Sequence, residues 1–184
     1  MTTKNTGTYT FDATHSNVEF AVKHMMITTV KGRFGDVKGT VEIPDNAEPK
    51  VDITIGVASI DTRVDARDQH LRSPDFFDVE KYPEMRFVST KAVKTDDGYS
   101  LTGDLSMHGV TRSVTLNVVE EGAGVDPWGN QKIAFSATGK FKRSDFGLNW
   151  NAALEAGGVL VSDEVKLSID AQLVKQAAST SKAA

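Results

Sequence analysis

Cysteine is absent from the 184 residues, which excludes disulfides, thiolate metal sites and a cysteine nucleophile. Long apolar runs are absent as well. Apolar residues make up 39% of the chain but are dispersed along it, so we expect no transmembrane segment. Neither sign of charge dominates, because 21 basic and 25 acidic residues leave a net charge of −4. This balance gives no electrostatic reason to expect a nucleic acid or an anionic membrane as a partner.

The two ends of the chain have few apolar residues. No apolar run that resembles a signal peptide occurs in residues 1–7, so we expect a cytoplasmic protein. Residues 1–7 and 175–184 are mostly small and polar, which predicts a flexible N-terminus and a disordered C-terminal tail. The length then fits a single domain over residues 8–174.

The motifs of common enzymes are also missing. No G-x-S-x-G, P-loop, G-x-G-x-x-G or H-E-x-x-H sequence occurs. The four histidines, His15, His24, His70 and His108, stand singly, so no element carries a pair at metal-ligand spacing. Acidic residues are plentiful, but the sequence places no pair as general acid and base. We therefore predict no catalytic site, no metal site and no cofactor.

What the sequence does have is strict alternation of apolar and polar residues. The alternating segments are 18–22, 41–43, 51–58, 99–107, 110–118, 133–141 and 165–173. A period of two predicts strands with one dry and one wet face, which is typical of antiparallel sheets.

The residues between these segments are typical of turns. Asp96-Asp97-Gly98 and His108-Gly109 join three consecutive segments and predict a meander of hairpins. One helix is predicted at residues 63–72, with Thr62 as its cap, and a second helical turn at residues 144–148.

An all-β fold of about eight strands can be a closed barrel or a two-layer sandwich. The meander favours an eight-stranded antiparallel barrel, because sequential neighbours then pair and closure removes both edges. A barrel of this size holds either packed side chains or one small ligand.

The inward-facing positions mix large and very small side chains. Small residues such as Gly103, Ala137, Gly139 and Ala171 leave volume among the phenylalanines. That volume predicts an apolar cavity, but the glycines are equally compatible with bends that close a filled barrel. Both interpretations stay open at this point.

Three polar residues also fall in the inward phase. His24 continues the phase of its strand and is either a hydrogen-bonded core histidine or a contact for a ligand head group. Lys91 and Arg112 lie near turns, where we expect them to reach water. The charges of residues 67–78 are interpreted as a solvated helix face, with Phe76 and Phe77 turned towards one end of the barrel.

Four stretches of the chain resemble the YceI family of lipocalin-like, polyisoprenoid-binding proteins. They are residues 12–20 with 22–24 (DATHSNVEF, VKH), 70–78 with 82–83 (HLRSPDFFD, YP), 103–105 with 108–112 (GDL, HGVTR), and 126–129 with 143–148 (DPWG, RSDFGL). The stretches occur in family order over residues 8–174, and together they are far more specific than any one of them.

The resemblance implies a lipocalin-like barrel with a helix near one end and a long hydrophobic pore. In that family the pore holds a long-chain apolar or amphiphilic molecule, such as an isoprenoid quinone or a polyprenyl chain. The function this implies is non-catalytic binding, transport or sequestration of such a cargo. A lipid-modifying enzyme and a filled barrel that acts as an interaction module are the alternatives. The oligomeric state is left open, a homodimer included.

The phase of the strands and the position of the helix predict which side chains contact the ligand. These are Phe20, Val22, His24, Phe34, Ile53, Ile55, Phe76, Phe77, Phe87, Leu101, Leu105, Val114, Leu116, Phe135, Ala137, Phe141 and Phe146.

Overall fold

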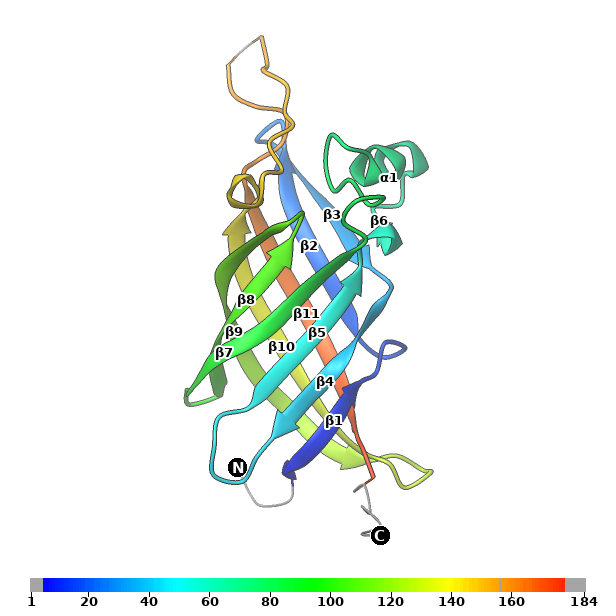
Figure 1. The fold of residues 1–184 in the computed structure, drawn as a ribbon, viewed down its shortest axis with the longest axis vertical. Coiled ribbons are helices and arrows are strands. Elements are labelled where there is room, and N and C mark those ends of the chain that lie inside the picture. Colours follow the sequence, from blue (N-terminus) through cyan, green and yellow to red (C-terminus); the bar gives the residue numbers. More distant parts are fainter. Residues whose placement is uncertain (1–4, 156, 178–184) are drawn as a thin grey trace.

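The computed structural model describes residues 5–155 and 157–177 of the chain. Strands dominate this part, and their mean direction follows the long axis of the molecule (Figure 1). The strand segments are β1 (Gly7–Phe11), β2 (Asn17–His24), β3 (Thr28–Phe34), β4 (Val37–Ile43), β5 (Lys50–Gly56), β6 (Ile60–Asp61), β7 (Glu84–Lys94), β8 (Gly98–Met107), β9 (Val110–Val125), β10 (Gln131–Lys142) and β11 (Glu164–Lys175). The helical segments are η2 (Val57–Ser59), α1 (Asp65–Arg72) and η3 (Arg143–Phe146).

These segments form an eight-stranded closed barrel, because three of the barrel strands are each interrupted once. β1 and β2 both pair with β11, at Phe11↔Leu173 and Val18↔Ile169, and so form one broken strand. β3 and β4 form the next strand, and β5 and β6 the third. β7 to β11 complete an antiparallel meander, which the pairing of β1 with β11 closes. The prediction of an eight-stranded antiparallel barrel is confirmed.

The predicted hairpins lie where the turn residues place them. His108 and Gly109 join β8 to β9 with φ of 52° and 74°. Positive φ at both central residues gives a turn whose twist matches that of the two strands. At the other predicted turn, Thr95 donates to the carbonyl oxygen of Gly98 between β7 and β8.

A bulge in β7 changes the phase of the strand. The pairing of β7 with β8 shifts register between Ser89 and Lys91. Phe87 therefore faces the interior before the bulge and Ala92 after it. Lys91 is exposed on the outside of the barrel, so the prediction that its position faces inwards was wrong. The extra residue at the bulge reverses the direction of every later side chain in the strand. Arg112 is exposed as well, as expected for a residue that reaches water.

Asp12 organises the break between β1 and β2. Its carboxylate accepts hydrogen bonds from the backbone N–H and the hydroxyl of Thr14, and from Nε2 of Gln172 on β11. Nδ1 of His15 lies 3.0 Å from the same carboxylate, and Nζ of Lys132 lies 3.5 Å away. The hydrogen bonds from Thr14, followed by those from Gln172 and His15, hold the pKa of Asp12 well below its usual value despite partial burial. The DATHS stretch is thus a strand-breaking turn.

The ends of the barrel extend slightly beyond the predicted domain. β1 begins at Gly7, within the segment predicted as flexible. Lys175 pairs with Tyr9, and Gln176 donates to the backbone oxygen of Thr8 and to the hydroxyl of Thr10. Lys175 and Gln176 are therefore held by β1, although they are the first two residues of the predicted tail 175–184. The tail was predicted to begin at least two residues too early. Residues 1–4 and 178–184 lie outside the described residues.

The helix is shorter than predicted. α1 begins at Asp65 with Val64 at its N-cap, so the prediction of Thr62 as the cap was wrong. Thr62 instead donates its backbone N–H and its hydroxyl to the carboxylate of Asp68, and both residues are buried. The second predicted helical turn is present as η3, which begins one residue earlier, at Arg143.

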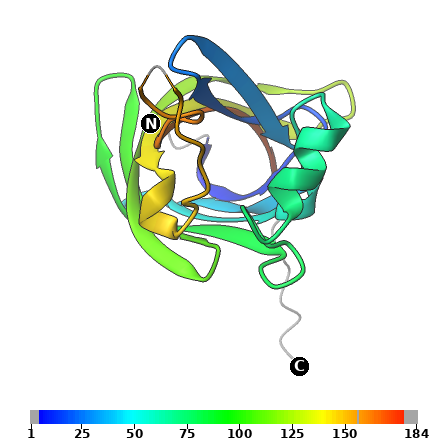
Figure 2. The same ribbon diagram turned by 90° about the horizontal axis from the view of Figure 1, so that it is seen from above.

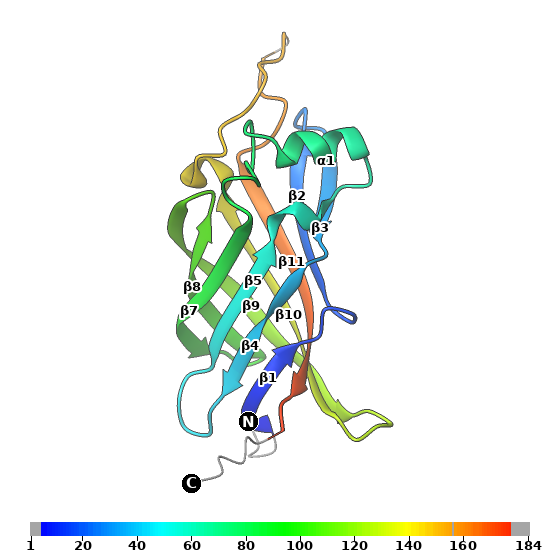
Figure 3. The same cartoon turned by 45° about the vertical axis from the view of Figure 1, so that its right-hand side comes forward.

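The two ends of the barrel are built differently. α1 lies at the end opposite to the one where β1 begins, as Figure 3 shows. At the β1 end, a buried apolar cluster fills the interior; its buried members are Tyr9, Val41, Ile43, Ile133 and Leu173. We call this cluster the floor.

Candidate ligand-binding site

A cavity of about 690 Å³ occupies the interior above the floor. Figure 2 looks along the barrel axis and shows α1 on one side of the ring of strands and η3 on the other. Inward-facing residues of the strands form the walls, and α1 with the segment after η3 forms the upper rim. The volume falls within the range of small-molecule sites, about 300–1,000 Å³. The interior is therefore not filled by side chains.

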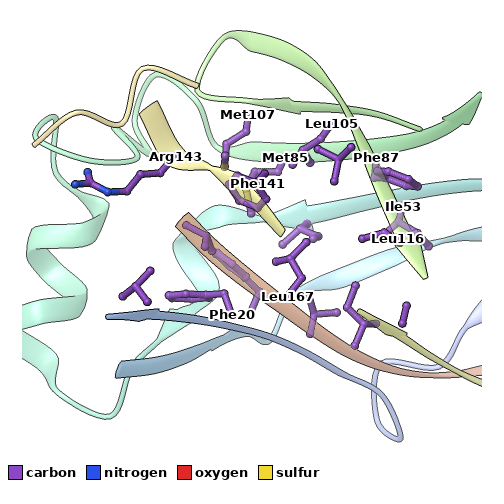
Figure 4. A pocket seen from close by; sticks show the side chains of 18 of the residues that line it. Phe20, Ile53, Met85, Phe87, Leu105, Met107, Leu116, Phe141, Arg143 and Leu167 are labelled. Carbon is purple, nitrogen blue, oxygen red and sulfur yellow. The ribbon is translucent and has the colours of Figure 1, made fainter. Parts of the chain in front are cut away.

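All but one of the side chains predicted to contact a ligand line this cavity. They are Phe20, Val22, His24, Phe34, Ile53, Ile55, Phe76, Phe77, Phe87, Leu101, Leu105, Val114, Leu116, Phe135, Ala137 and Phe141. In Figure 4, Phe20, Phe87 and Phe141 project into a common space between the strands. The phase of each strand places these residues because alternate side chains point to the same face.

Phe146 is the exception. Its side chain is 1% exposed and does not line the cavity; it packs edge-on against Phe141, with ring centroids 5.2 Å apart. The prediction for Phe146 was wrong because it lies in η3, where the alternation of a strand does not apply. Phe146 instead supports a lining residue from behind.

The small inward residues play two different roles. Ala137 and Ala171 line the cavity, but Gly103 and Gly139 do not. A Cβ on Gly103 would lie 2.4 Å from Cζ of Phe87, and one on Gly139 would lie 2.5 Å from a methyl group of Leu116. A neighbouring side chain therefore already occupies the space above each glycine. The void arises at the alanines, while the glycines let large residues lie flat on the wall.

The rim of the cavity, which we call the mouth, is closed in part by three aromatic side chains. The ring of Trp150 lies 4.9 Å from His70 and 5.1 Å from Phe76, and His70 and Phe76 are themselves 5.1 Å apart. These contacts join α1 to the segment after η3. Trp150 was not among the predicted residues, because the segment 149–163 has no periodicity that predicts a direction for its side chains.

Arg143 holds that segment in place. Its Nε donates to the backbone oxygen of Ser162 (3.0 Å), and its Nη1 donates to those of Leu148 (2.6 Å) and Trp150 (2.8 Å). The side chain is 6% exposed, and burial lowers the pKa of the guanidinium while the nearby Asp163 opposes this change. Although the residue belongs to the RSDFGL stretch, its contact with the cavity was not predicted.

Arg67 and His70 of α1 also line the mouth, so the interpretation of their charges as a purely solvated face was wrong. Nε and Nη2 of Arg67 donate to the hydroxyl and the backbone oxygen of Thr62, both at 2.7 Å. His70 shares a hydrogen bond with Asp75 at 2.9 Å. A helix of eight residues with this many charges gives no sequence signal for which side chains turn inwards.

His24 lies at the top of β2 and faces the cavity as its phase predicts. Its backbone forms an isolated bridge with Val161, which attaches β2 to the segment after η3. Within residues 5–155 and 157–177, no group of three or more histidine or acidic side chains is close enough to hold a metal ion.

The chain also matches a known protein family. A family model for the YceI-like domain fits residues 9–173. The chain belongs to the YceI-like family. Protein YceI of Escherichia coli is 40% identical over 164 residues, which cover 88% of this chain and 83% of that protein. The UPF0312 protein plu2095 of Photorhabdus laumondii is 44% identical over 134 residues, covering 72% of this chain and 70% of its own length.

Solved structures agree with this assignment. The YceI protein of Campylobacter jejuni superimposes with a TM-score of 0.73 and 34% identity over 84% of this chain and 90% of its own. BcnA of Burkholderia cenocepacia gives a TM-score of 0.76 at 25% identity over 88% and 98% of the two chains. A domain from Saccharophagus degradans shares the fold, with a TM-score of 0.69 at 17% identity over 91% and 98%.

Helices of this YceI-like protein are too short or too polar to cross a bilayer, as far as the described part of the chain extends.

Proposed function

We propose that this YceI-like protein binds one long-chain, isoprenoid-like lipid in its barrel and carries or sequesters it without chemical change. The observation that supports this proposal most directly is the cavity of about 690 Å³, whose walls are almost entirely apolar. The solved domain from Saccharophagus degradans is described as polyisoprenoid binding, which agrees with such a ligand. An isoprenoid quinone or a polyprenyl chain has the required chemistry.

The physical basis is the removal of the chain from water. Each buried methylene group contributes about 0.8 kcal/mol of gross stabilisation, so a long chain gains much from a dry cavity. The loss of chain freedom offsets a large part of that gain, so the size of the cavity alone does not set the affinity. An empty apolar cavity is also unfavourable, because its lining atoms lose van der Waals contacts on one side.

The shape of the site favours a chain that enters from the mouth. Tyr9 and Ile133 seal the floor with side chains at most 2% exposed. The polar side chains that line the mouth are His24, Thr62, Arg67, His70 and Arg143. We therefore propose that the chain lies along the barrel with its free end at the floor and its polar end at the mouth.

Native mass spectrometry of the purified protein, followed by titration of solvent-stripped protein with an isoprenoid quinone, tests the proposal. We expect a copurified lipid and saturable binding of one quinone. Ala137→Phe fills the cavity and should reduce occupancy, while overpacking costs about 1–3 kcal/mol of stability. Thr138→Phe is the matched control, since Thr138 is the next residue on β10 and is exposed outside the barrel.

An empty protein that takes up no chain lipid would refute the proposal. An enzyme is the second candidate, and the pairing of His70 with Asp75 at the mouth is the arrangement that favours it. Mass spectra of the lipid before and after incubation separate the two functions, because a carrier returns its ligand unchanged.

A further inference from the structure

Exposed apolar side chains gather beside the mouth of the barrel. On the β2–β3 turn, Met26 is 67% and Ile27 is 75% exposed, and Met25 next to them is exposed as well. Val159, in the segment after η3, is also exposed. The two segments are joined, because the backbone N–H of Met25 donates to the carbonyl oxygen of Leu160. Both extend beyond the neighbouring strands at the end where α1 lies (Figure 1). We call Met25, Met26, Ile27 and Val159 the rim patch.

The β2–β3 turn places two methionines where the backbone favours other residues. Met25 and Met26 have φ of 51° and 61°, and the backbone N–H of Ile27 donates to the carbonyl oxygen of His24. Central turn residues with positive φ are usually asparagine, aspartate or glycine, because larger side chains are strained there. Such strain is typical of functional sites. Sδ of Met26 approaches Gly158, but most of the side chain lies in solvent, so packing does not explain the strain.

The rim patch is continuous with the apolar wall of the cavity. His24 lines the cavity immediately before Met25, and Leu160 lines it immediately after Val159. Val64, which precedes α1, lines the cavity and is itself 46% exposed. On this side of the mouth, apolar side chains therefore continue from the cavity wall to the outer surface.

The rim patch also lies in sequence that is poor in charge. Residues 25–30 contain no acidic or basic residue, and residues 149–161 contain only Glu155, although a quarter of the whole chain is charged. Transfer of a charge into hydrocarbon is very costly, so segments without charge enter it most easily. Methionine suits such a contact, because its flexible thioether adapts to irregular surroundings.

A lipid bilayer accounts for these features better than a protein partner does. Exposed apolar patches mark sites for either one. A bound chain has to cross the mouth when it leaves the cavity, and each methylene group that enters water there is unfavourable. A rim that is seated in lipid removes this barrier, because the chain then passes from one apolar phase to another. A protein seated on the same rim would cover the mouth instead.

We propose that the rim patch docks on a lipid bilayer and opens the cavity directly to it, so that the chain lipid is exchanged by collision with the membrane. The inference rests on the proposed function and adds that a bilayer surface is the donor and the acceptor of the ligand. Insertion of apolar side chains drives the docking, since the patch is uncharged and the protein has a net charge of −4. Zwitterionic phosphatidylcholine is therefore sufficient.

The absence of cysteine allows a dye to be placed at a single position. Ile27→Cys carries an environment-sensitive dye in the rim patch, and Val125→Cys carries the same dye on the β9–β10 hairpin near the floor. Val125 is the matched control, because it is 66% exposed and stands close in sequence to Trp128, which is 83% exposed. With phosphatidylcholine vesicles, we expect a blue shift and quenching by spin-labelled lipid at position 27 and neither at position 125.

Transfer of an isoprenoid quinone from loaded protein to phosphatidylcholine vesicles measures the consequence of docking. The rate should rise in proportion to the vesicle concentration. Met26→Ser combined with Ile27→Ser should slow transfer about tenfold or more, since two apolar side chains no longer insert. The affinity for the quinone should change less than about twofold, because neither residue lines the cavity. Val125→Ser is the control and should transfer at the unaltered rate.

A second variant separates docking from stability. Met25→Asn combined with Met26→Gly gives the turn residues that its positive φ favours. We expect an equal or higher melting temperature together with transfer that is about tenfold slower. Transfer at the unaltered rate in this variant would show that the methionines do not serve docking.

Equal dye responses at positions 27 and 125, or none at either, would overturn the docking site and leave the carrier function standing. A transfer rate independent of vesicle concentration would overturn it too, since the quinone would then leave through water. So would a dimer of the unaltered protein that Ile27→Ser dissociates, because a second copy would then cover the patch. Failure of stripped protein to bind any chain lipid would instead refute the proposed function, while the dye experiment still decides the docking.

Discussion

The floor and the mouth of this barrel close the same interior by different means. At the floor, Tyr9, Ile133 and Leu173 come from strands whose backbone groups are paired in the ladders of β1, β10 and β11. At the mouth, α1 and the segment after η3 are attached by side chains that donate to backbone oxygens, as Arg143 does. The packed strands exclude water from the floor. The mouth instead retains polar groups, which would have no hydrogen-bond partners in a core made of strands alone.

The difference extends to what each end exposes to solvent. At the β2–β3 turn next to the mouth, Met26 is 67% and Ile27 is 75% exposed, while Tyr9, Ile133 and Leu173 of the floor are each at most 2% exposed. α1 is attached to the barrel partly through Arg72, which donates to the backbone oxygens of Ala58 and Ile60. Elements with few buried apolar contacts open locally at lower free energy than a packed core. The comparison therefore predicts a rigid floor and an adaptable mouth.

The largest expected effect is at the floor. Leu173→Asp places a carboxylate in a fully buried apolar cluster, where an unpaired charge is very costly. We expect a loss of about 4 kcal/mol or more in the free energy of unfolding, measured by urea denaturation. Lys166→Asp, at an exposed site on the same strand, is the control and should change stability by about 0.5 kcal/mol at most. Equal losses in both variants would mean that the floor is not dry.

A smaller effect is expected at the mouth. Arg143→Met removes the donors that hold Leu148, Trp150 and Ser162, so those backbone oxygens lose their partner. We expect a loss of about 2–3 kcal/mol in stability, together with faster proteolysis within residues 149–163. Limited proteolysis with mass-spectrometric mapping detects that opening.

Arg112→Met is the matched control for this variant. Arg112 is exposed and, among the residues that the structure describes, donates only to the neighbouring Thr111, so its replacement should leave both measurements unchanged. Uniform cleavage of the Arg143→Met variant along the whole barrel would contradict a division into a rigid floor and an adaptable mouth.

The smallest expected effect lies between the two ends, at the break that Asp12 organises. Asp12→Asn removes the negative charge of the carboxylate that accepts hydrogen bonds from Thr14 and Gln172. We expect this change to lower the free energy of unfolding by about 1 kcal/mol at neutral pH. Because folding lowers the pKa of Asp12, its contribution is present above the unfolded value of about 3.9 and is lost as the pH falls towards the folded value. The stability difference between the two proteins should therefore shrink below about pH 4.

Urea denaturation of both proteins at a series of pH values measures this difference. A constant difference from neutral pH down to strong acid would show that the charge of Asp12 contributes nothing to stability.

Sequence patterns predicted the walls of the site better than its ends. Ile53, Leu101 and Phe135 face the interior because alternation is local: a side chain reverses direction with each residue as long as the strand is regular. Phe146 and Lys91 were misplaced for the same reason. One lies in a 3-10 turn and the other follows a bulge, and both interruptions end the alternation. Neither interruption has a sequence signal as strong as the period of the strands.

The sequence by itself determined the closed meander, the inward phase of its strands and the family, because all three depend on local periodicity and on residues in a fixed order. Only the tertiary structure decided that Phe87 and Leu116 cover the glycines, and that Arg67, Arg143 and Trp150 meet at the mouth. The directions of these side chains depend on contacts between segments far apart in the chain. Those contacts exist only once the barrel has closed, so no local pattern records them.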